Sequence, residues 1–185
     1  MTFIVVDSKK LDIYDLLLLI LAASEDFTHI KGRTTLQKLG YFIVNKLDID
    51  NDYIHHYYGP FSPMLTMCLG RLVSLKLINE EYSLTENDRA VYIYSLTEKG
   101  KKYCEEVIDN NKESFNTIKK IVENLKEIKG DTIETLSFAA KIHYIENKAK
   151  TNLNEYYLPE MAKRYGWNIS DKDLIKSSRE LLNLI

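Results

Sequence analysis

The sequence predicts a mainly α-helical fold that contains one small β-hairpin. Apolar residues recur at helical spacing over most of the chain, and N-capping residues precede several of these stretches. One segment, 80–100, instead alternates in the manner of two strands joined by a polar turn. The 185 residues suffice to bury a normal core, and only three prolines and seven glycines argue against long loops.

The first expected elements are a short strand and two helices. β-Branched and aromatic residues at 2–6 predict the strand, and the segment 11–26 predicts a helix that is apolar nearly all round and therefore buried. A second helix is expected after Gly32, with Thr34 as its N-cap and Gln37 completing a capping box.

The segment HHYYGPFSP, residues 55–63, leads into a third helix. Gly59 and Pro60 predict a tight turn, and Ser62 followed by Pro63 has the pattern of an N-cap with proline at the first helical position. Neighbouring side chains of an extended chain point to opposite faces, so the two adjacent histidines are not expected to line one site. The segment therefore predicts a corner that orients the third helix.

The hairpin is the clearest local signal. Alternation around 82–84 and 91–95, separated by the polar residues ENDR, predicts two strands and a turn. Thr97 then caps a helix that is expected to reach about Ile128, unless the residues DNN at 109–111 interrupt it. Its apolar positions form a heptad-like seam, which leaves open either one long packing helix or a dimeric coiled coil. The seam consists of Cys104, Ile108, Asn111, Phe115, Ile118, Val122 and Leu125.

Three further helices are expected beyond residue 130. The first begins at Asp131, the second opens at Pro159, and the last is capped by Ser170. Basic residues near the end could also belong to a second helix-turn-helix. Trp167 instead favours a lobe that is anchored to the preceding core by a large aromatic side chain.

This order of helices followed by a hairpin is that of a winged helix-turn-helix with a helical C-terminal extension. In such a fold three helices form a compact unit and the hairpin is the wing. We therefore predict a winged-helix domain over 1–100 and a helical extension, consisting of a long helix and C-terminal helices, over 101–185.

Three blocks of sequence resemble known winged-helix families. Y-S-L-T-E-K-G, at 94–100, resembles the strand-to-helix junction of MarR- and PadR-like proteins. GRTTLQKLGYFI at 32–43 and YYGPFSPMLTMCLGRLVSLKLI at 57–78 resemble the YwgA-like family and the related Panacea (SocA-like) domains, which share an L-Q-K-L-x-Y-F-type helix and a Y-G-P turn. The resemblance covers roughly residues 10–105. It implies a winged-helix-like fold and, for Panacea domains, antitoxin action, so that a toxin is one expected partner.

Charge, cysteine content and apolar runs indicate which partners and which location to expect. A net charge of −2 gives no global attraction to nucleic acid. Two cysteines, Cys68 and Cys104, lie in apolar helical patterns and are expected to be reduced core residues, not zinc ligands. The longest apolar run, 16–23, is too short to span a bilayer, and 1–10 lacks the order of a signal peptide. We expect a cytoplasmic protein without a membrane partner.

Fold analogy favours a DNA-binding transcriptional regulator, with double-stranded DNA as its partner. The expected exposed positions of the third helix, Met64, Thr66, Met67 and Gly70, form a poor surface for reading bases. The alternative is a protein-binding module, antitoxin-like or an adaptor, that uses the two methionines, unless the C-terminal helices bury them. The candidate residues for binding nucleic acid or a partner are Lys31, Arg33, Lys38, Met64, Met67, Arg71, Lys76 and Arg89.

Catalysis is not expected. The sequence has no phosphate loop, no G-x-S-x-G elbow and no H-E-x-x-H motif, so no catalytic, metal or cofactor residue is predicted. His143 is expected to be a core histidine with a satisfied ring nitrogen. The heptad-like seam leaves a homodimer open as a further assembly, beside the single packing helix that is favoured.

Overall fold

The computed structural model describes residues 11–24, 30–84, 90–125, 132–154 and 156–185. The strand predicted at 2–6 and the cap at Asp131 lie outside these residues. The helices are α1 (Ile13–Ala23), α2 (Arg33–Lys46), α3 (Pro63–Ser74), α4 (Glu98–Asn110), α5 (Lys112–Asn124), α6 (Thr132–Ala149), α7 (Tyr157–Lys163) and α8 (Lys172–Leu184). The strands are β1 (Ile30–Lys31), β2 (Ile78–Leu84) and β3 (Ala90–Leu96).

The first half of the chain has winged-helix topology. Helix, strand, two helices and two strands follow one another, and the strands form an antiparallel sheet in the order β1-β3-β2. Tyr94 on β3 pairs with Ile30 on one side and with Glu80 on the other. The mainly helical fold and the hairpin are thereby confirmed, whereas β1 is a strand that the sequence pattern did not reveal.

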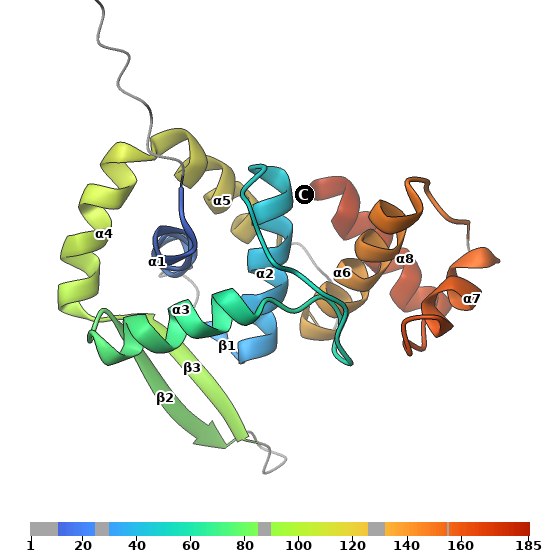
Figure 1. Ribbon diagram of the computed structural model, residues 1–185, viewed down its shortest axis with the longest axis horizontal. Coiled ribbons are helices and arrows are strands. Elements are labelled where there is room, and N and C mark those ends of the chain that lie inside the picture. Colours follow the sequence, from blue (N-terminus) through green and yellow to red (C-terminus); the bar gives the residue numbers. More distant parts are fainter. Residues whose placement is uncertain (1–10, 25–29, 85–89, 126–131, 155) are drawn as a thin grey trace, which may run out of the picture.

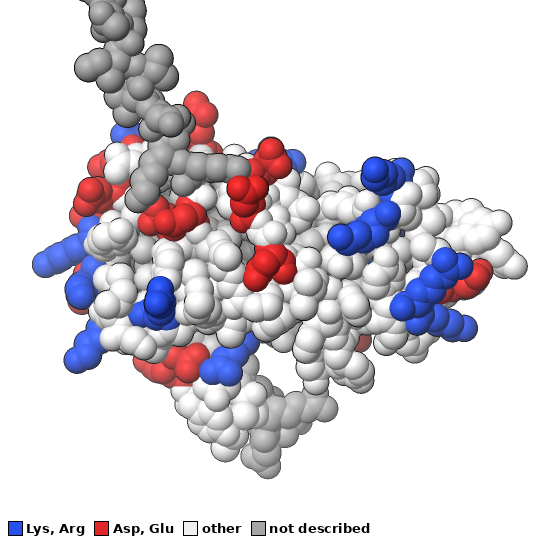
Figure 2. Space-filling view, in the orientation of Figure 1, with Lys and Arg blue, Asp and Glu red and all other residues white. Residues whose placement is uncertain are grey.

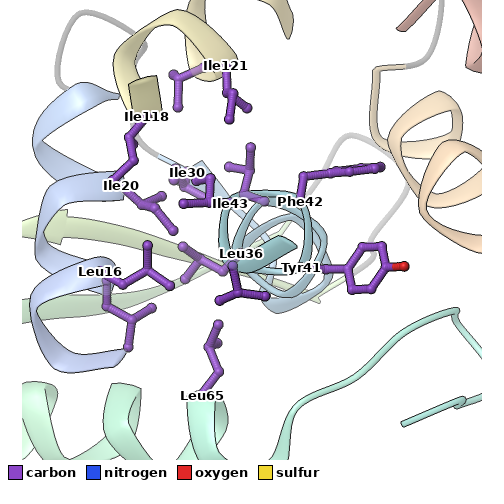
Figure 3. Close-up of a cluster of buried hydrophobic side chains, with 14 of the residues drawn as sticks. Leu16, Ile20, Ile30, Leu36, Tyr41, Phe42, Ile43, Leu65, Ile118 and Ile121 are labelled. Atoms are coloured by element: carbon purple, nitrogen blue, oxygen red, sulfur yellow. The ribbon is translucent and has the colours of Figure 1, made fainter. Parts of the chain in front are cut away.

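Helix α1 lies at the centre of this half. In Figure 1 it is seen end-on, with α2, α3, α4 and α5 arranged around it, and it contacts all four. Every residue from Leu16 to Leu21 is buried, as expected for a helix that is apolar all round. Figure 3 shows side chains of α1, α2, α3 and α5 meeting in one core, among them Leu16, Leu65 and Ile118.

The interruption that the sequence left open at 109–111 is confirmed, because Asn111 divides the helix predicted from residue 98 into α4 and α5. Asn111 has non-helical backbone angles, φ −133° and ψ 38°, and its side-chain amide donates to the carbonyl of Val107 at 2.9 Å. Asparagine often competes for backbone hydrogen bonds in this way and ends helices. The break lets both helices pack against α1, so the seam residues Ile118 and Val122 are buried inside the chain and the continuous coiled-coil seam does not exist.

Two of the predicted helix caps are confirmed. Ser62 and Thr97 each accept a hydrogen bond at 2.9 Å from the backbone three residues later. The predicted capping box is wrong: α2 begins after Gly32, which has no side chain to cap it. The last helix is capped by Asp171 in place of Ser170.

The C-terminal helices pack on the outer side of α2. Helix α6 contacts α2, and α8 contacts both α6 and α5. Trp167 is buried and its indole N–H donates to the carbonyl of His56 at 2.7 Å, which confirms that it anchors this lobe. Inside the lobe, Arg179 forms two hydrogen bonds of 2.7 and 2.8 Å with the buried carboxylate of Glu146.

Candidate functional site

A structured corner sets the position of α3, the helix that would read DNA in a winged-helix regulator. Ile54 and Phe61 exchange two backbone hydrogen bonds, at 2.9 and 3.0 Å, and Gly59 turns the chain between them with φ 100°. Asp52 then accepts hydrogen bonds from the Ser62 hydroxyl and, at 2.9 Å, from the Met64 amide. Its negative charge at the helix N-terminus also complements the helix dipole.

Gln37 connects α2 to the first turn of α3. Its amide nitrogen donates to the Ser62 carbonyl at 3.0 Å and to the Thr66 hydroxyl at 2.9 Å, and its amide oxygen accepts from the Ser62 amide at 2.9 Å. Gln37 thus helps to fix α3, although the sequence assigned it to a capping box.

The two helices also approach closely at Gly40. A side chain there would begin 2.5 Å from Leu65 Cδ1 and 2.7 Å from the Tyr53 hydroxyl. A larger residue at position 40 would therefore require the Leu65 and Tyr53 side chains to move.

The outward side of α3 is apolar and uncharged over its first two turns. Met64 and Met67 are 43% and 53% exposed, and Thr66 and Gly70 are exposed beside them. The alternative that the C-terminal helices bury the two methionines is therefore wrong. In Figure 2, which shows this face, lysines and arginines are scattered among acidic residues and much of the surface is uncharged.

A groove of about 480 Å³ runs between α3 and the wing. It carries one basic and one acidic side chain, Arg33 and Glu80, which form an ion pair at 3.2 Å. The groove is lined by Arg33, Gln37, Phe61, Leu65, Thr66, Leu69, Gly70, Val73 and Glu80.

Aromatic side chains continue this groove along the wing. Residues two apart in a strand share a face, so Tyr82 and Leu84 lie on the same side of β2 as Glu80. Both are exposed. Tyr82 packs against its cross-strand partner Tyr92, and the Arg33 guanidinium stacks on the Tyr92 ring at 3.9 Å.

The predicted basic residues do not form one patch. Arg33 donates to Tyr94 and pairs with Glu80, and Arg71 donates to the Tyr14 hydroxyl at 3.0 Å. Lys31 and Lys76 are exposed. Arg89 lies outside the described residues.

Lys38 does not fit the role of a phosphate contact, because it is only 2% exposed. Its amine donates to the Pro60 carbonyl at 2.8 Å, beneath the turn at Gly59. Burial, together with the nearby charge of Lys141, lowers the pKa of Lys38 to about 7. This lysine supports the corner from below and does not reach a ligand on the α3 face.

The structure describes three histidines, His55, His56 and His143. His143 shares a hydrogen bond of 2.9 Å with the Tyr41 hydroxyl, and burial lowers the pKa of His143. His55 and His56 are both exposed at the corner. Among the described residues, no three or more histidine, cysteine or acidic side chains gather in a way that could hold a metal ion.

No family model matches this sequence, and no curated protein matches it. In the part of the chain that the structure describes, none of the helices has both the length and the apolar character needed to cross a bilayer.

Proposed function

We propose that this chain is a protein-binding module that uses the winged-helix fold, and that the outward side of α3 is its interaction surface. The exposure of Met64 and Met67 carries this proposal, together with the absence of any charged residue on α3 before Arg71. Methionine side chains adapt to varied apolar partners, and apolar side chains gathered on one exposed face are typical of protein contacts.

The placement of the basic residues supports the same proposal. Affinity for DNA depends mainly on lysines and arginines that reach phosphates. Lys38 is buried, and the exposed Arg33 is paired with Glu80 beside the groove. Glu81 is a further exposed acid on the wing. The phosphates of a nucleic acid would therefore meet little net positive charge on this face.

Photo-crosslinking from within α3 tests the proposal. A benzophenone amino acid is placed at Met67, and for comparison at Tyr103, an exposed residue of α4. Irradiation of cells that carry the native gene should give a discrete protein adduct from position 67 and none from position 103. An adduct to DNA, or no adduct from position 67, would overturn the assignment of α3 as a protein-binding surface.

DNA-binding regulation is a second candidate, favoured by the winged-helix order of elements and by the exposure of Lys31 and Lys76. In this fold the third helix enters the major groove and the wing contacts the backbone. A mobility-shift assay at low salt with DNA from upstream of the chain's own gene separates the two candidates. Binding that weakens with salt, and on Arg71→Ala or Lys76→Ala, would replace the protein-binding proposal.

A further inference from the structure

Lys38 lies at a point where three parts of the chain meet. It projects from α2 and is only 2% exposed, because the turn at Gly59 and Pro60 and the side chain of Lys141 on α6 enclose it. A carbon added at Gly59 would lie 3.2 Å from Lys38 Cε and 3.2 Å from Lys141 Cγ. Residues 55–60, which we call the corner turn, therefore pack directly against the aliphatic stems of both lysines.

The enclosure suits an uncharged amine at Lys38. Nζ donates to the Pro60 carbonyl at 2.8 Å, and this is the one hydrogen bond that the amine forms with the described residues. Protonation would add a further donor and a full positive charge. Burying an unpaired charge costs much more than burying a neutral polar group. The closed corner turn therefore favours the neutral form of Lys38.

The charged groups around Lys38 do not compensate a proton there. Burial and the positive charge of Lys141 lower the pKa of Lys38 from 10.5 to about 7. The nearby acids have other partners: Glu134 acts on Lys141, Asp52 accepts hydrogen bonds at the start of α3, and Glu146 pairs inside the C-terminal lobe. The remaining titratable side chains on the central turns of α2 and α6 and on the segment 52–60 are Tyr41, Tyr53, His55, His56, Tyr57, Tyr58, His143 and Tyr144.

The corner turn is also the place where the C-terminal lobe attaches to the first half of the chain. The indole N–H of Trp167 donates to the His56 carbonyl at 2.7 Å, and the His55 ring packs on the Tyr165 ring with centroids 5.8 Å apart. The Gly59 amide donates to the same His56 carbonyl at 2.9 Å. Movement of the corner turn away from Lys38 would therefore break contacts with the lobe as well.

We propose that protonation of Lys38 opens the corner turn, so that the contact between the C-terminal lobe and the corner depends on pH. In the closed turn the neutral amine donates to the Pro60 carbonyl; in the open turn water reaches the ammonium group. Because the closed turn weakens proton binding at Lys38, a bound proton must favour the open turn by the same free energy. This inference goes beyond the proposed function and does not depend on what α3 binds.

The pH range of the effect follows from the two states of Lys38. An open turn leaves the amine in water, where its pKa is near the ordinary value of 10.5, whereas the closed turn lowers the pKa to about 7. The closed turn is therefore most stable above pH 10.5, loses stability as the pH falls, and is least stable at about pH 7 and below.

Amide hydrogen exchange, followed by NMR on the full-length chain between about pH 7 and 8.5, tests the inference. The Gly59 amide reports opening of the corner turn, and the amide of the buried Leu19 on α1 reports global unfolding. In the wild type the protection factor of Gly59 should fall by up to about 10-fold for each unit by which the pH is lowered, because opening takes up one proton. It should remain below the protection factor of Leu19 throughout.

Two variants separate the effect of Lys38 from that of the histidines. Lys38→Met should make the protection of Gly59 independent of pH. His56→Gln removes a titrating ring but keeps the backbone carbonyl to which Gly59 and Trp167 donate, so the pH dependence should persist. In the wild type, the carbon-13 shift of Lys38 Cε should titrate well below pH 10.5, a measurement that needs no variant to fold.

Fluorescence provides an independent measure, because Trp167 is the single tryptophan of the chain. Quenching of Trp167 by acrylamide should increase as the pH is lowered from about 8.5 to 7 in the wild type and in His56→Gln, but not in Lys38→Met. A Gly59 protection factor that does not change with pH in the wild type, or that equals the value for Leu19, would overturn the inference. A pH dependence that Lys38→Met retains would overturn it as well.

Discussion

Replacing Lys38 with methionine should remove most of the rise in stability that the protein shows between pH 7 and about pH 9.5. Methionine retains the length of the aliphatic stem but loses the amine that donates to the Pro60 carbonyl. The site is buried between α2, the corner at Gly59 and the side chain of Lys141 on α6. A positive charge there is poorly solvated, and that cost determines how stability depends on pH.

The sign and size of the effect follow from the pKa of Lys38, which burial lowers from 10.5 to about 7. Between these values the unfolded chain binds a proton at Lys38 that the native chain lacks, so the free energy of unfolding rises with pH. The whole gap corresponds to about 5 kcal/mol of destabilisation below pH 7, of which about 3 kcal/mol is recovered by pH 9.5. Methionine avoids this cost but leaves the Pro60 carbonyl without its donor, a loss of about 1–3 kcal/mol at all pH values.

Urea unfolding followed by circular dichroism at several pH values between 7 and about 9.5 measures the difference between wild type and Lys38→Met. Burial also lowers the pKa of Lys141, but that residue is present in both proteins and its contribution largely cancels. Above about pH 10 the slope reverses, because burial raises the pKa of Tyr41 and Tyr94 and the unfolded chain then loses protons first. Lys102→Met, at an exposed position of α4, is the matched control. A difference between wild type and Lys38→Met that stays constant with pH would refute the claim that Lys38 is desolvated.

Three further substitutions test other parts of the structure by chemical denaturation. Gly70→Ala should stabilise the protein by about 0.5–1 kcal/mol, because alanine suits a helix interior better and the site is open; a loss of stability would mean that other atoms occupy the space beside Gly70. Gly40→Ala should cost about 1–3 kcal/mol, since the new carbon would lie 2.5 Å from Leu65 Cδ1, and a neutral result would show that the Leu65 and Tyr53 side chains move aside easily. Arg179→Met should cost about 1.5–3 kcal/mol by leaving the buried Glu146 carboxylate without its partner, and Glu146→Gln in the same background should recover part of that loss.

Sequence predicts the elements of this fold best where the determining interactions are local. The amides that Ser62 and Thr97 cap lie only three residues further along the chain, and the two seven-residue strands of the hairpin are consecutive in the sequence and pair with each other. Such patterns depend on neighbouring residues, so they can be recognised in the sequence without knowledge of the tertiary structure. By contrast, β1 has two residues, Ile30 and Lys31, and so it shows no alternation at all. Its pairing with β3 is made by a contact across more than sixty residues.

The candidate site was predicted in part. The exposed positions of α3 follow from helical spacing, and Met64 and Met67 are exposed as that spacing suggests. The burial of Lys38 could not be read in this way, because one apolar stripe on α2 accounts for a single buried face. Helix α6, about one hundred residues later, covers a second face and encloses Lys38 with Tyr41 and Phe42. The adjacent aromatic residues 41 and 42 are the one sequence signal that α2 is covered on two sides.

The central position of α1 has a consequence for synthesis of the chain. Its residues Leu16–Leu21 are made well before α5, the helix that closes over them and that begins at Lys112. At a translation rate of about 5–20 residues per second, roughly 5–20 s pass between the synthesis of α1 and that of the helix that covers it. During that interval it presents to the cell a surface like that of an aggregation-prone intermediate. We therefore expect the yield of folded protein to depend on chaperones that bind apolar segments during translation.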